Sequence, residues 1–219
     1  IFFDFLDDRL DVDKYIVLSR HSSRARVKSY TVHHTGNPGP EALYGGKPWE
    51  LSVASPRVSY ALLLNLRKHA IEYGRLDEYD VSYEATHHGP TGVEKPLCFI
   101  EIGSTMEEWI DNVNREVVAL AVVKFLSDDE KECTPVLGVG GGHYPRKHTK
   151  KAFNNAYCYG HIFAKYAVPY LNRELIVKGV ERSMPKPIKI VVEKKGTRLE
   201  QRKMLENLVL SMGLDLEYI

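Results

Sequence analysis

Short runs rich in β-branched and aromatic residues alternate along the chain with longer stretches in which apolar residues recur at helical spacing. A strand buries a face and a helix buries a stripe, so alternating elements pack most simply when helices cover a sheet. The pattern therefore predicts an α/β protein rather than a β-sandwich or a helical bundle. The expected strands span 15–18, 30–33, 81–85, 97–102, 136–139, 188–192 and 214–219.

Three helices are expected, each starting at a residue whose side chain can accept hydrogen bonds from the first backbone amides. They begin at Ser55, Ser104 and Thr197 and end before Gly74, at Lys124 and before Gly213. Proline follows the first cap, at a position where no backbone donor is needed. The second and third helices carry glutamate three residues after the cap, which is the spacing of a capping box.

The length and charge of the chain limit its class. With 219 residues it can bury a core of its own, so a single domain over 1–219 is expected. No apolar stretch is long enough to cross a bilayer, and a soluble, cytoplasmic protein is expected. The formal net charge of +1 exerts no long-range pull on nucleic acid. The sequence starts at Ile1 in an apolar segment, so the natural start is expected upstream.

The cysteines are Cys98, Cys133 and Cys158. They are too few and too scattered for a disulfide framework, and they lack the paired spacing of a zinc knuckle. We therefore expect no disulfide framework, and a reducing compartment fits the sequence best.

Two short runs, 146–151 and 194–198, are basic, and each is expected to be a loop beside the start of a helix. Runs of this kind are more often a solvated face than a phosphate-binding site. A solvated face is therefore the favoured interpretation, with phosphate binding as the alternative.

Histidines gather after the predicted strands, where ligands collect in α/β sheets. They are His21, His33, His34, His87, His88, His143 and His161. A histidine in such a loop can bind a metal, act as a general base or make a structural hydrogen bond. Taken singly, each is more often structural, but their recurrence at several strand ends predicts that some converge on one site. Adjacent residues of an extended chain point opposite ways, so only one of His87 and His88 is expected to face that site unless the turn at 89–90 rotates the second toward it.

Glu101 interrupts an apolar strand immediately before a helix. A carboxylate there is costly to bury unless it is paired. It could bind a metal, orient a ligating histidine or act as a general base for water. The alternative is a buried salt bridge to arginine or lysine.

A glycine-rich segment, Gly140, Gly141 and Gly142, joins a strand to the basic run. Such glycines let backbone amides approach a phosphate or a developing oxyanion, although a tight turn would also explain them. Their spacing fits neither a nucleotide-binding loop nor a dinucleotide fingerprint. Lys165, four residues after His161, could contact a phosphate or a substrate carbonyl, but such lysines are more often surface residues. No serine-hydrolase elbow or zinc-protease helix is present.

Several of these segments together resemble the D-aminoacyl-tRNA deacylases of archaea and plants, in order and spacing and over nearly the whole chain. They are 31–33 with 36–37, E-A-T-H-H-G-P at 84–90, 101–105 with 108–109, G-G-G-H-Y at 140–144, and 160–161 with 165–166. The positions that match the family motifs are His21, His33, His87, His88, Glu101, His143 and His161, whereas His34 and His148 are not expected in the pattern. The chain also begins after the first part expected of the family, so an N-terminal strand and helix are expected to be missing.

The resemblance implies a three-layer α/β/α fold with a mixed, mostly parallel sheet, of the phosphorylase/hydrolase-like type related to peptidyl-tRNA hydrolase. It also implies hydrolysis of the ester between a D-amino acid and tRNA, with one or two zinc ions as cofactors. The partner would be tRNA charged with a D-amino acid, and no membrane or protein partner is indicated.

These expectations assign a role to each residue of the site. Zinc would be held by a subset of His88, His143, His161 and Glu101, and the catalytic residues would be His87, Glu101 and Lys165. Phosphates near the acceptor end would contact Arg146, Lys147, Lys150 and Lys151, and Gly140, Gly141 and Gly142 would hold the oxyanion or a phosphate. His21 and His33 are further candidates. The alternatives are a metal-free esterase with a histidine as general base, and a non-catalytic tRNA-binding protein.

Overall fold

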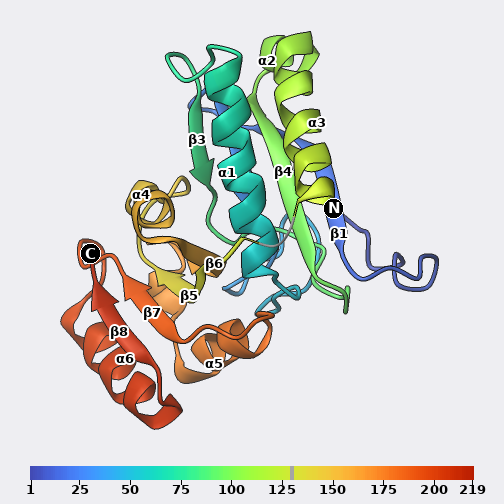
Figure 1. The fold of residues 1–219 in the computed structure, drawn as a ribbon. Helices are drawn as coiled ribbons and strands as arrows, with labels where there is room; N and C mark the ends of the chain where they lie inside the picture. Colours follow the sequence, from blue (N-terminus) through green and yellow to red (C-terminus); the bar gives the residue numbers. More distant parts are fainter. Residues whose placement is uncertain (129–130) are drawn as a thin grey trace.

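The strands form two four-stranded sheets (Figure 1). The computed structural model describes residues 1–128 and 131–219. The first sheet has the order β1-β4-β2-β3, with β1 (Tyr15–Ser22), β2 (Ser29–His33), β3 (Asp80–Tyr83) and β4 (Leu97–Ser104). Strand β2 runs antiparallel to β4, whereas β1 pairs with β4 and β3 pairs with β2 in parallel.

The second sheet is parallel throughout and has the order β6-β5-β7-β8. Its strands are β5 (Thr134–Val139), β6 (Tyr157–Phe163), β7 (Lys189–Val192) and β8 (Asp215–Tyr218). The expected α/β class and the mixed, mostly parallel pairing are confirmed, and the strands are divided between two sheets.

All the predicted strands are present with small shifts of their ends, but β6 was missed. Gly160 lies in its interior, and glycine weakens the strand signal of a sequence. A Cβ atom at Gly160 would lie 2.3 Å from Ser183 Oγ. The close approach of the segment that contains Ser183 therefore requires glycine at this position.

The three predicted helices correspond to α1 (Pro56–Glu72), to α2 (Met106–Ile110) with α3 (Asn112–Ser127), and to α6 (Leu199–Met212). The second was expected as one helix and is divided in two. Asp111 causes the break, because its carboxylate accepts hydrogen bonds from the amides of Val113 at 2.7 Å and Asn114 at 3.3 Å and so starts a new helix. Helix α1 packs against α3 and against β6.

Both predicted capping boxes lie one residue later than expected. Thr105 caps α2, since Ser104 still belongs to β4, and Glu108 Oε2 accepts from the Thr105 amide at 2.8 Å. At α6, Gln201 Oε1 accepts from the amide of Arg198 at 2.8 Å. At α2 the end of β4 selects Thr105 rather than Ser104 as the cap. At α6 the Arg198 side chain cannot accept a hydrogen bond, so only the half of the box that Gln201 supplies is formed.

Two further helices, α4 (Arg146–Asn155) and α5 (Arg173–Glu181), were not predicted, and a short 3-10 helix, η1 (Val168–Tyr170), precedes α5. Helix α4 was expected to be a loop because it is rich in charged residues and buries only His148, Thr149 and Ala152. Too few apolar residues recur for the helical period to be visible. No helix in the two described ranges combines the length and the apolar character needed to span a membrane.

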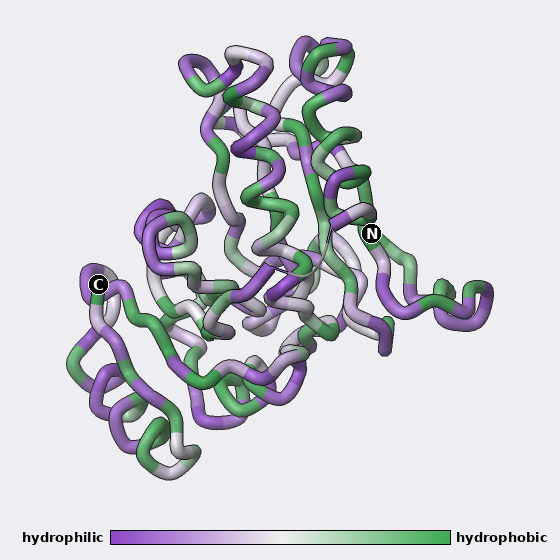
Figure 2. Tube along the Cα trace, in the orientation of Figure 1, coloured by the Kyte–Doolittle hydropathy of each residue, from purple (hydrophilic) through white to green (hydrophobic). Residues whose placement is uncertain are grey.

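The buried apolar side chains form three clusters. The largest joins both sheets through α1 and α3, and includes Tyr30 of β2, Leu62 of α1 and Tyr159 of β6. A second packs α5 and α6 against the second sheet, and a third, small cluster lies around Leu97 and Phe99 of β4. Figure 2 shows the hydrophobic colour running along much of β4, which is buried over its whole length.

The expectation of no disulfide is wrong, because Cys133 and Cys158 are bonded to one another with their Cα atoms 5.7 Å apart. The register of the second sheet explains the pairing. Pro135 of β5 lies opposite Cys158 of β6, so Cys133, just before β5, comes within reach of it. The sequence did not reveal this contact because β6 itself was not predicted.

We expect loss of this disulfide to destabilise the fold by about 3 kcal/mol, since it closes a loop of 25 residues in the unfolded chain. The variants C133S and C158S should have similarly lowered melting temperatures, and the double variant should be no less stable than either, because each removes the same bond. Differential scanning calorimetry measures all three. Melting temperatures equal to that of the unaltered protein would contradict the prediction.

Candidate active site

The polar site lies where the ends of the first sheet meet the loop after β5. His21 stands near the end of β1, His33 ends β2 and Glu101 lies in β4. Glu84 follows β3 directly, and the next residue donates its amide to the carbonyl of His143 at 2.9 Å. This backbone hydrogen bond brings His143, which lies in the loop after β5 of the second sheet, into the site.

Glu84 is the centre of the site, and its side chain is fully buried. Its Oε1 lies 3.1 Å from His21 Nδ1. Its Oε2 lies 2.9 Å from His143 Nε2 and 3.5 Å from His87 Nε2. Glu84 begins the motif at 84–90, but no role was predicted for it. The strand before it, Asp80–Tyr83, is partly polar, so a carboxylate at its end does not stand out in the sequence as Glu101 does.

Glu101 lies beside the same group. Its Oε2 is 3.4 Å from His21 Nδ1 and 3.6 Å from His33 Nε2, and its side chain is 4% exposed. Within the described ranges its ionic neighbours are histidines, with no arginine or lysine among them. The buried salt bridge considered as an alternative is therefore absent from this part of the chain, and the carboxylate faces histidine rings.

The electrostatics divide the cluster into a charged part and a neutral part. Burial alone would lower the pKa of His21, but hydrogen bonds to Glu101 and Glu84 raise it to about 10. Burial likewise opposes ionisation of Glu101, yet His21 and His33 hold its pKa at about 2. Burial and the neighbouring charge of His33 lower the pKa of His87 and bring that of His88 to about 4. At neutral pH these last two rings are uncharged.

Both His87 and His88 face the cluster, which is the outcome expected only if the turn rotates the second ring. Their ring centres are 4.4 Å apart, and they lie 4.4 and 5.0 Å from the ring of His33. The backbone explains this rotation, since His88 has a φ of +45° and the chain is no longer extended there. The turn rotates His88 toward the side that His87 already faces.

Three of the rings offer the same nitrogen to the centre of the cluster. The Nδ1 atoms of His33, His87 and His88 lie 3.3, 2.8 and 2.6 Å from backbone carbonyl oxygens. A carbonyl oxygen can only accept, so each Nδ1 carries a proton, and the neutral rings of His87 and His88 present an unprotonated Nε2. Metal-binding histidines are typically held in this way. Burial would lower the pKa of His33, but contact of its Nε2 with Glu101 raises it, so a metal ion would have to displace a proton from this ring.

The donor atoms fit a metal ion on independent grounds. Ligand atoms of three sets lie within 4.8 Å of one another. The sets are His33 with His87 and His88, His21 with Glu84 and His143, and His33 with Glu84 and Glu101. In the described ranges, neither oxygen of Glu84 nor the Nε2 of His33 makes a hydrogen bond of good geometry. Buried acceptors without a donor are costly, and a shared cation would satisfy them.

His161 lies apart from this cluster. Its Nδ1 is 3.2 Å from Thr86 Oγ1 and its Nε2 is 3.2 Å from the carbonyl oxygen of Ser52. Burial lowers its pKa to about 3, and it belongs to none of the metal-capable sets found in the described ranges. The discounted histidines, His34 and His148, are also buried elsewhere, against the Leu97 carbonyl and the Tyr159 hydroxyl.

The glycine loop is less suited to an anion than expected. The amide of Gly140 already donates to the Phe163 carbonyl at 2.8 Å. A Cβ atom at Gly141 would lie 3.2 Å from Glu193 Oε2, so a carboxylate borders the loop. Gly140 and Gly141 have φ values of +91° and +86°, as a tight turn requires. Lys165 donates its amide to Gly141 and its side chain is exposed.

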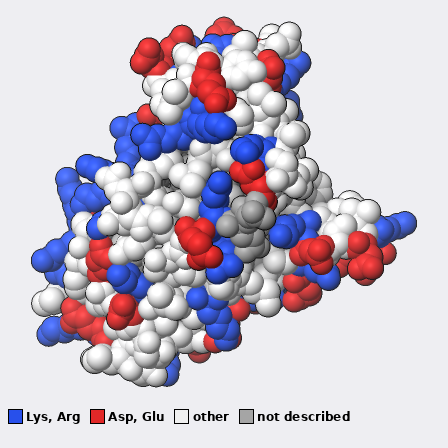
Figure 3. Space-filling view, viewed as in Figure 1, with Lys and Arg blue, Asp and Glu red and all other residues white. Residues whose placement is uncertain are grey.

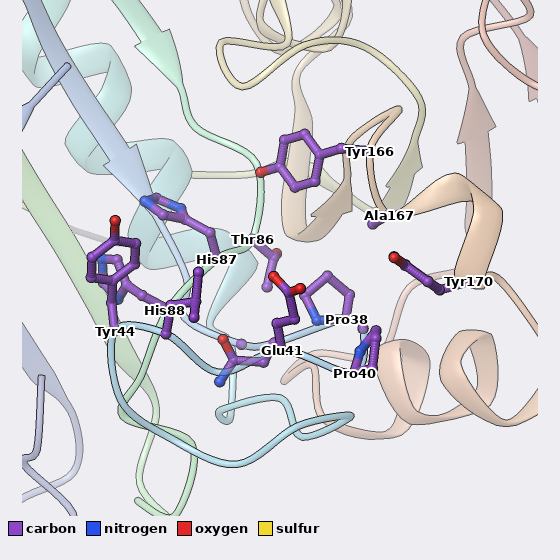
Figure 4. Close-up of a pocket in the computed structure, with 14 residues that line it drawn as sticks. Pro38, Pro40, Glu41, Tyr44, Thr86, His87, His88, Tyr166, Ala167 and Tyr170 are labelled. Carbon is purple, nitrogen blue, oxygen red and sulfur yellow. The ribbon is translucent and has the colours of Figure 1, made fainter. Parts of the chain in front are cut away.

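A pocket of about 250 Å³ adjoins the cluster, and His87 and His88 form part of its wall (Figure 4). The other walls come from the loop after β2 and from the segment of η1, including Tyr44, Tyr166 and Tyr170. The Tyr166 hydroxyl is directed toward His87 in this view. Burial and the charge of Glu84 raise the pKa of Tyr166 to about 12.

The four predicted phosphate contacts lie on α4, where Lys and Arg gather at the left of the molecule in Figure 3. Several are already paired: Arg146 with Asp80 at 2.6 Å, Lys147 near Glu193 at 3.9 Å, and Lys151 with Glu217 at 2.6 Å. Lys150 and Arg146 line a cavity of about 310 Å³ together with Arg67 of α1. This cavity therefore has three cationic side chains in its lining against one carboxylate, Asp80.

Comparison with known proteins gives a consistent match. The family model described as D-aminoacyl-tRNA deacylase matches residues 8–217. The D-aminoacyl-tRNA deacylase of Staphylothermus marinus is 65% identical over all of this chain and 80% of the relative's length, and that of Desulfurococcus amylolyticus is 58% identical over all of this chain and 81% of its own. A crystal structure of a conserved protein of unknown function superposes with a TM-score of 0.89 at 34% identity, covering 97% of this chain and 73% of that one.

The variant E84Q is expected to lower the pKa of His21 from about 10, because it removes a hydrogen bond and a negative charge that favour the protonated ring. An NMR pH titration of ¹⁵N-histidine-labelled, chelator-treated protein measures this. The control E50Q removes a glutamate that pairs with Lys178 instead, and should leave His21 unchanged. A His21 pKa that does not move in E84Q would refute the pairing.

Proposed function

The chain belongs to the D-aminoacyl-tRNA deacylase family, and from this premise we propose that residues 1–219 form one deacylase domain that hydrolyses the ester between a D-amino acid and tRNA. The products would be the free D-amino acid and tRNA. The observation that carries the proposal is the cluster of two buried carboxylates and convergent histidines that opens into a pocket. Because charged tRNA is its substrate, the enzyme would act in the cytoplasm.

We further propose zinc as the metal. Imidazole and carboxylate suit zinc, and three protein ligands with an open position are typical of catalytic zinc sites. His33, His87 and His88 would hold one ion, because their ligand nitrogens lie within 4.8 Å of one another and two of the three residues border the pocket. His21, Glu84 and His143 could hold a second. When bound, zinc would lower the pKa of water and polarise the ester carbonyl.

The protein's own residues have separate tasks in this proposal. Glu84 and Glu101 are ionised and buried beside the rings, so either can accept a proton from the attacking water. His143 is 33% exposed and lies 2.9 Å from Glu84, which places it where it can pass a proton to the leaving ribose oxygen. Lys165 remains a candidate for contact with substrate carbonyl or phosphate. His161 is not retained as a ligand, because both of its ring nitrogens have other partners.

A metal-free esterase is the second candidate, and the contact between His143 and Glu84 favours it. A histidine held by a buried carboxylate is a common general base. In that mechanism His143 would remove a proton from water, and the remaining histidines would serve only to balance the two carboxylates. Resistance of the activity to chelators separates it from the zinc mechanism.

We expect the protein to release tyrosine from D-tyrosyl-tRNA but not from L-tyrosyl-tRNA. Chelation should remove this activity and zinc should restore it, because the metal would supply the activated water. Release of labelled amino acid measures the rate, and elemental analysis measures the zinc. The variant H88A should lose bound zinc, whereas H69Q, which alters an α1 histidine paired with Glu72, should retain it. Activity that survives chelation would support the metal-free mechanism, and absence of D-specific release would refute the function.

Binding of tRNA should depend on the basic face of α4. Replacing Lys147 and Lys150 with alanine should weaken binding of tRNA and reduce the slope of log affinity against log salt by about 1.5, since about 0.7–0.9 counterions are released per phosphate contact. Fluorescence anisotropy over a range of salt concentrations measures this. The control K68A/K203A removes the same charge from α1 and α6. Equal slopes for both double variants would show that α4 does not contact phosphate.

A further inference from the structure

The pocket contains a carboxylate, that of Glu41, which the proposed hydrolysis does not use. Among its 14 lining residues, Glu41 is the single carboxylate, and no lysine or arginine belongs to the lining. Most of the wall is apolar or aromatic, formed by prolines, Leu43 and three tyrosines. The cavity therefore carries a negative charge at one point of a largely apolar surface. A phosphate would be repelled there, whereas a small organic cation would be attracted.

The amide and the threonine hydroxyl of the pocket already have structural partners. Asn37 donates to the carbonyl of Gly45 at 2.9 Å, and Thr86 Oγ1 accepts from the amide of Ile162 at 3.0 Å. Glu41 is exposed, and no ion pair to it occurs within the described ranges. In Figure 4 its carboxylate points into the pocket, with His87 and His88 on one side and Tyr166 and Tyr170 on the other. It is thus positioned to meet a ligand rather than to hold the loop.

The chemistry of the substrate supplies a matching cation. The aminoacyl group of a charged tRNA carries an α-amino group next to the ester carbonyl, and such groups are protonated near neutral pH. When the ester carbonyl lies at the histidine cluster, the ammonium nitrogen is two bonds away from the carbonyl carbon, on the neighbouring α-carbon. The side chain of the amino acid would occupy the apolar remainder of the pocket.

We propose that Glu41 binds the α-ammonium group of the aminoacyl moiety in this pocket and determines specificity there. This inference rests on the proposed function. A carboxylate and an ammonium form a charge-assisted hydrogen bond, which is stronger than a neutral one.

The same arrangement gives a physical basis for selection of one configuration at the α-carbon. The α-carbon would be fixed at three points: its carbonyl at the histidines, its ammonium at Glu41 and its side chain against the tyrosines and prolines. In the opposite configuration, if the carbonyl and the ammonium keep their contacts, the side chain takes the place of the hydrogen atom and points away from the apolar wall. One of the two forms must therefore give up either the ion pair or the apolar contact, and the proposed function identifies that form as L.

The test uses amide analogues of the tRNA end, which resist hydrolysis. 3′-(D-tyrosylamino)-3′-deoxyadenosine carries the ammonium, and its partner, in which a hydroxyl replaces the α-amine, has nearly the same shape without the charge. Calorimetry at pH 6.5, where the amine is protonated, should show at least about tenfold tighter binding of the amine to the unaltered protein. The variant E41Q should bring this ratio close to one. E107Q, which removes an exposed glutamate of α2, should preserve it.

Two results would overturn the proposal: an amine preference that is unchanged in E41Q, or no binding of either analogue by the unaltered protein. The L-tyrosyl analogue adds a third measurement, because the preference for D over L should also fall in E41Q. Failure of the proposed function is seen separately, as absence of tyrosine release from D-tyrosyl-tRNA. A Glu41-dependent amine preference without release would keep the pocket assignment and refute deacylation.

Discussion

The burial of Glu84 and Glu101 beside one another is the constraint on which the site depends. Two carboxylates cannot share a dry environment unless positive charge is held close to both. Here histidine rings provide it, drawn from two strands of the first sheet and from loops of both sheets. The arrangement can exchange protons for a divalent cation without changing its overall charge balance. A structural salt bridge to arginine would not offer that exchange.

The site also connects the two sheets. The amide of Ala85 reaches the carbonyl of His143, and the amide of Thr86 reaches that of Ile162 in β6. His161, which sequence analysis placed among the ligands, belongs to this connection, because its ring bridges Thr86 and Ser52. His161 is therefore buried because it helps to hold the two sheets together. Its place in a sequence motif does not imply that it contacts a metal.

Much of the fold could be predicted from local patterns, and much of the site could not. Strands and capped helices were recognisable because their signals lie within a few residues, whereas α4 and β6 lack a clear apolar period and were missed. Glu101 was recognised as an unusual carboxylate in an apolar strand. Glu84 was not recognised, because its role depends on contacts with His21 of β1 and with His143 of the loop after β5, which are distant in sequence. The disulfide was hidden for the same reason, because it depends on the pairing of β5 with β6.

The pairing of Glu193 with Lys147 sets opposite charges against one another where the glycine loop meets α4. These two charges offset one another, so neither would strongly attract or repel a polyanion at that border. Lys150 is exposed and has no ion pair within the described residues, and it lines the same cavity as Arg67 of α1. The backbone of a nucleic acid would therefore be drawn toward the cavity between α1 and α4 rather than along the glycine loop.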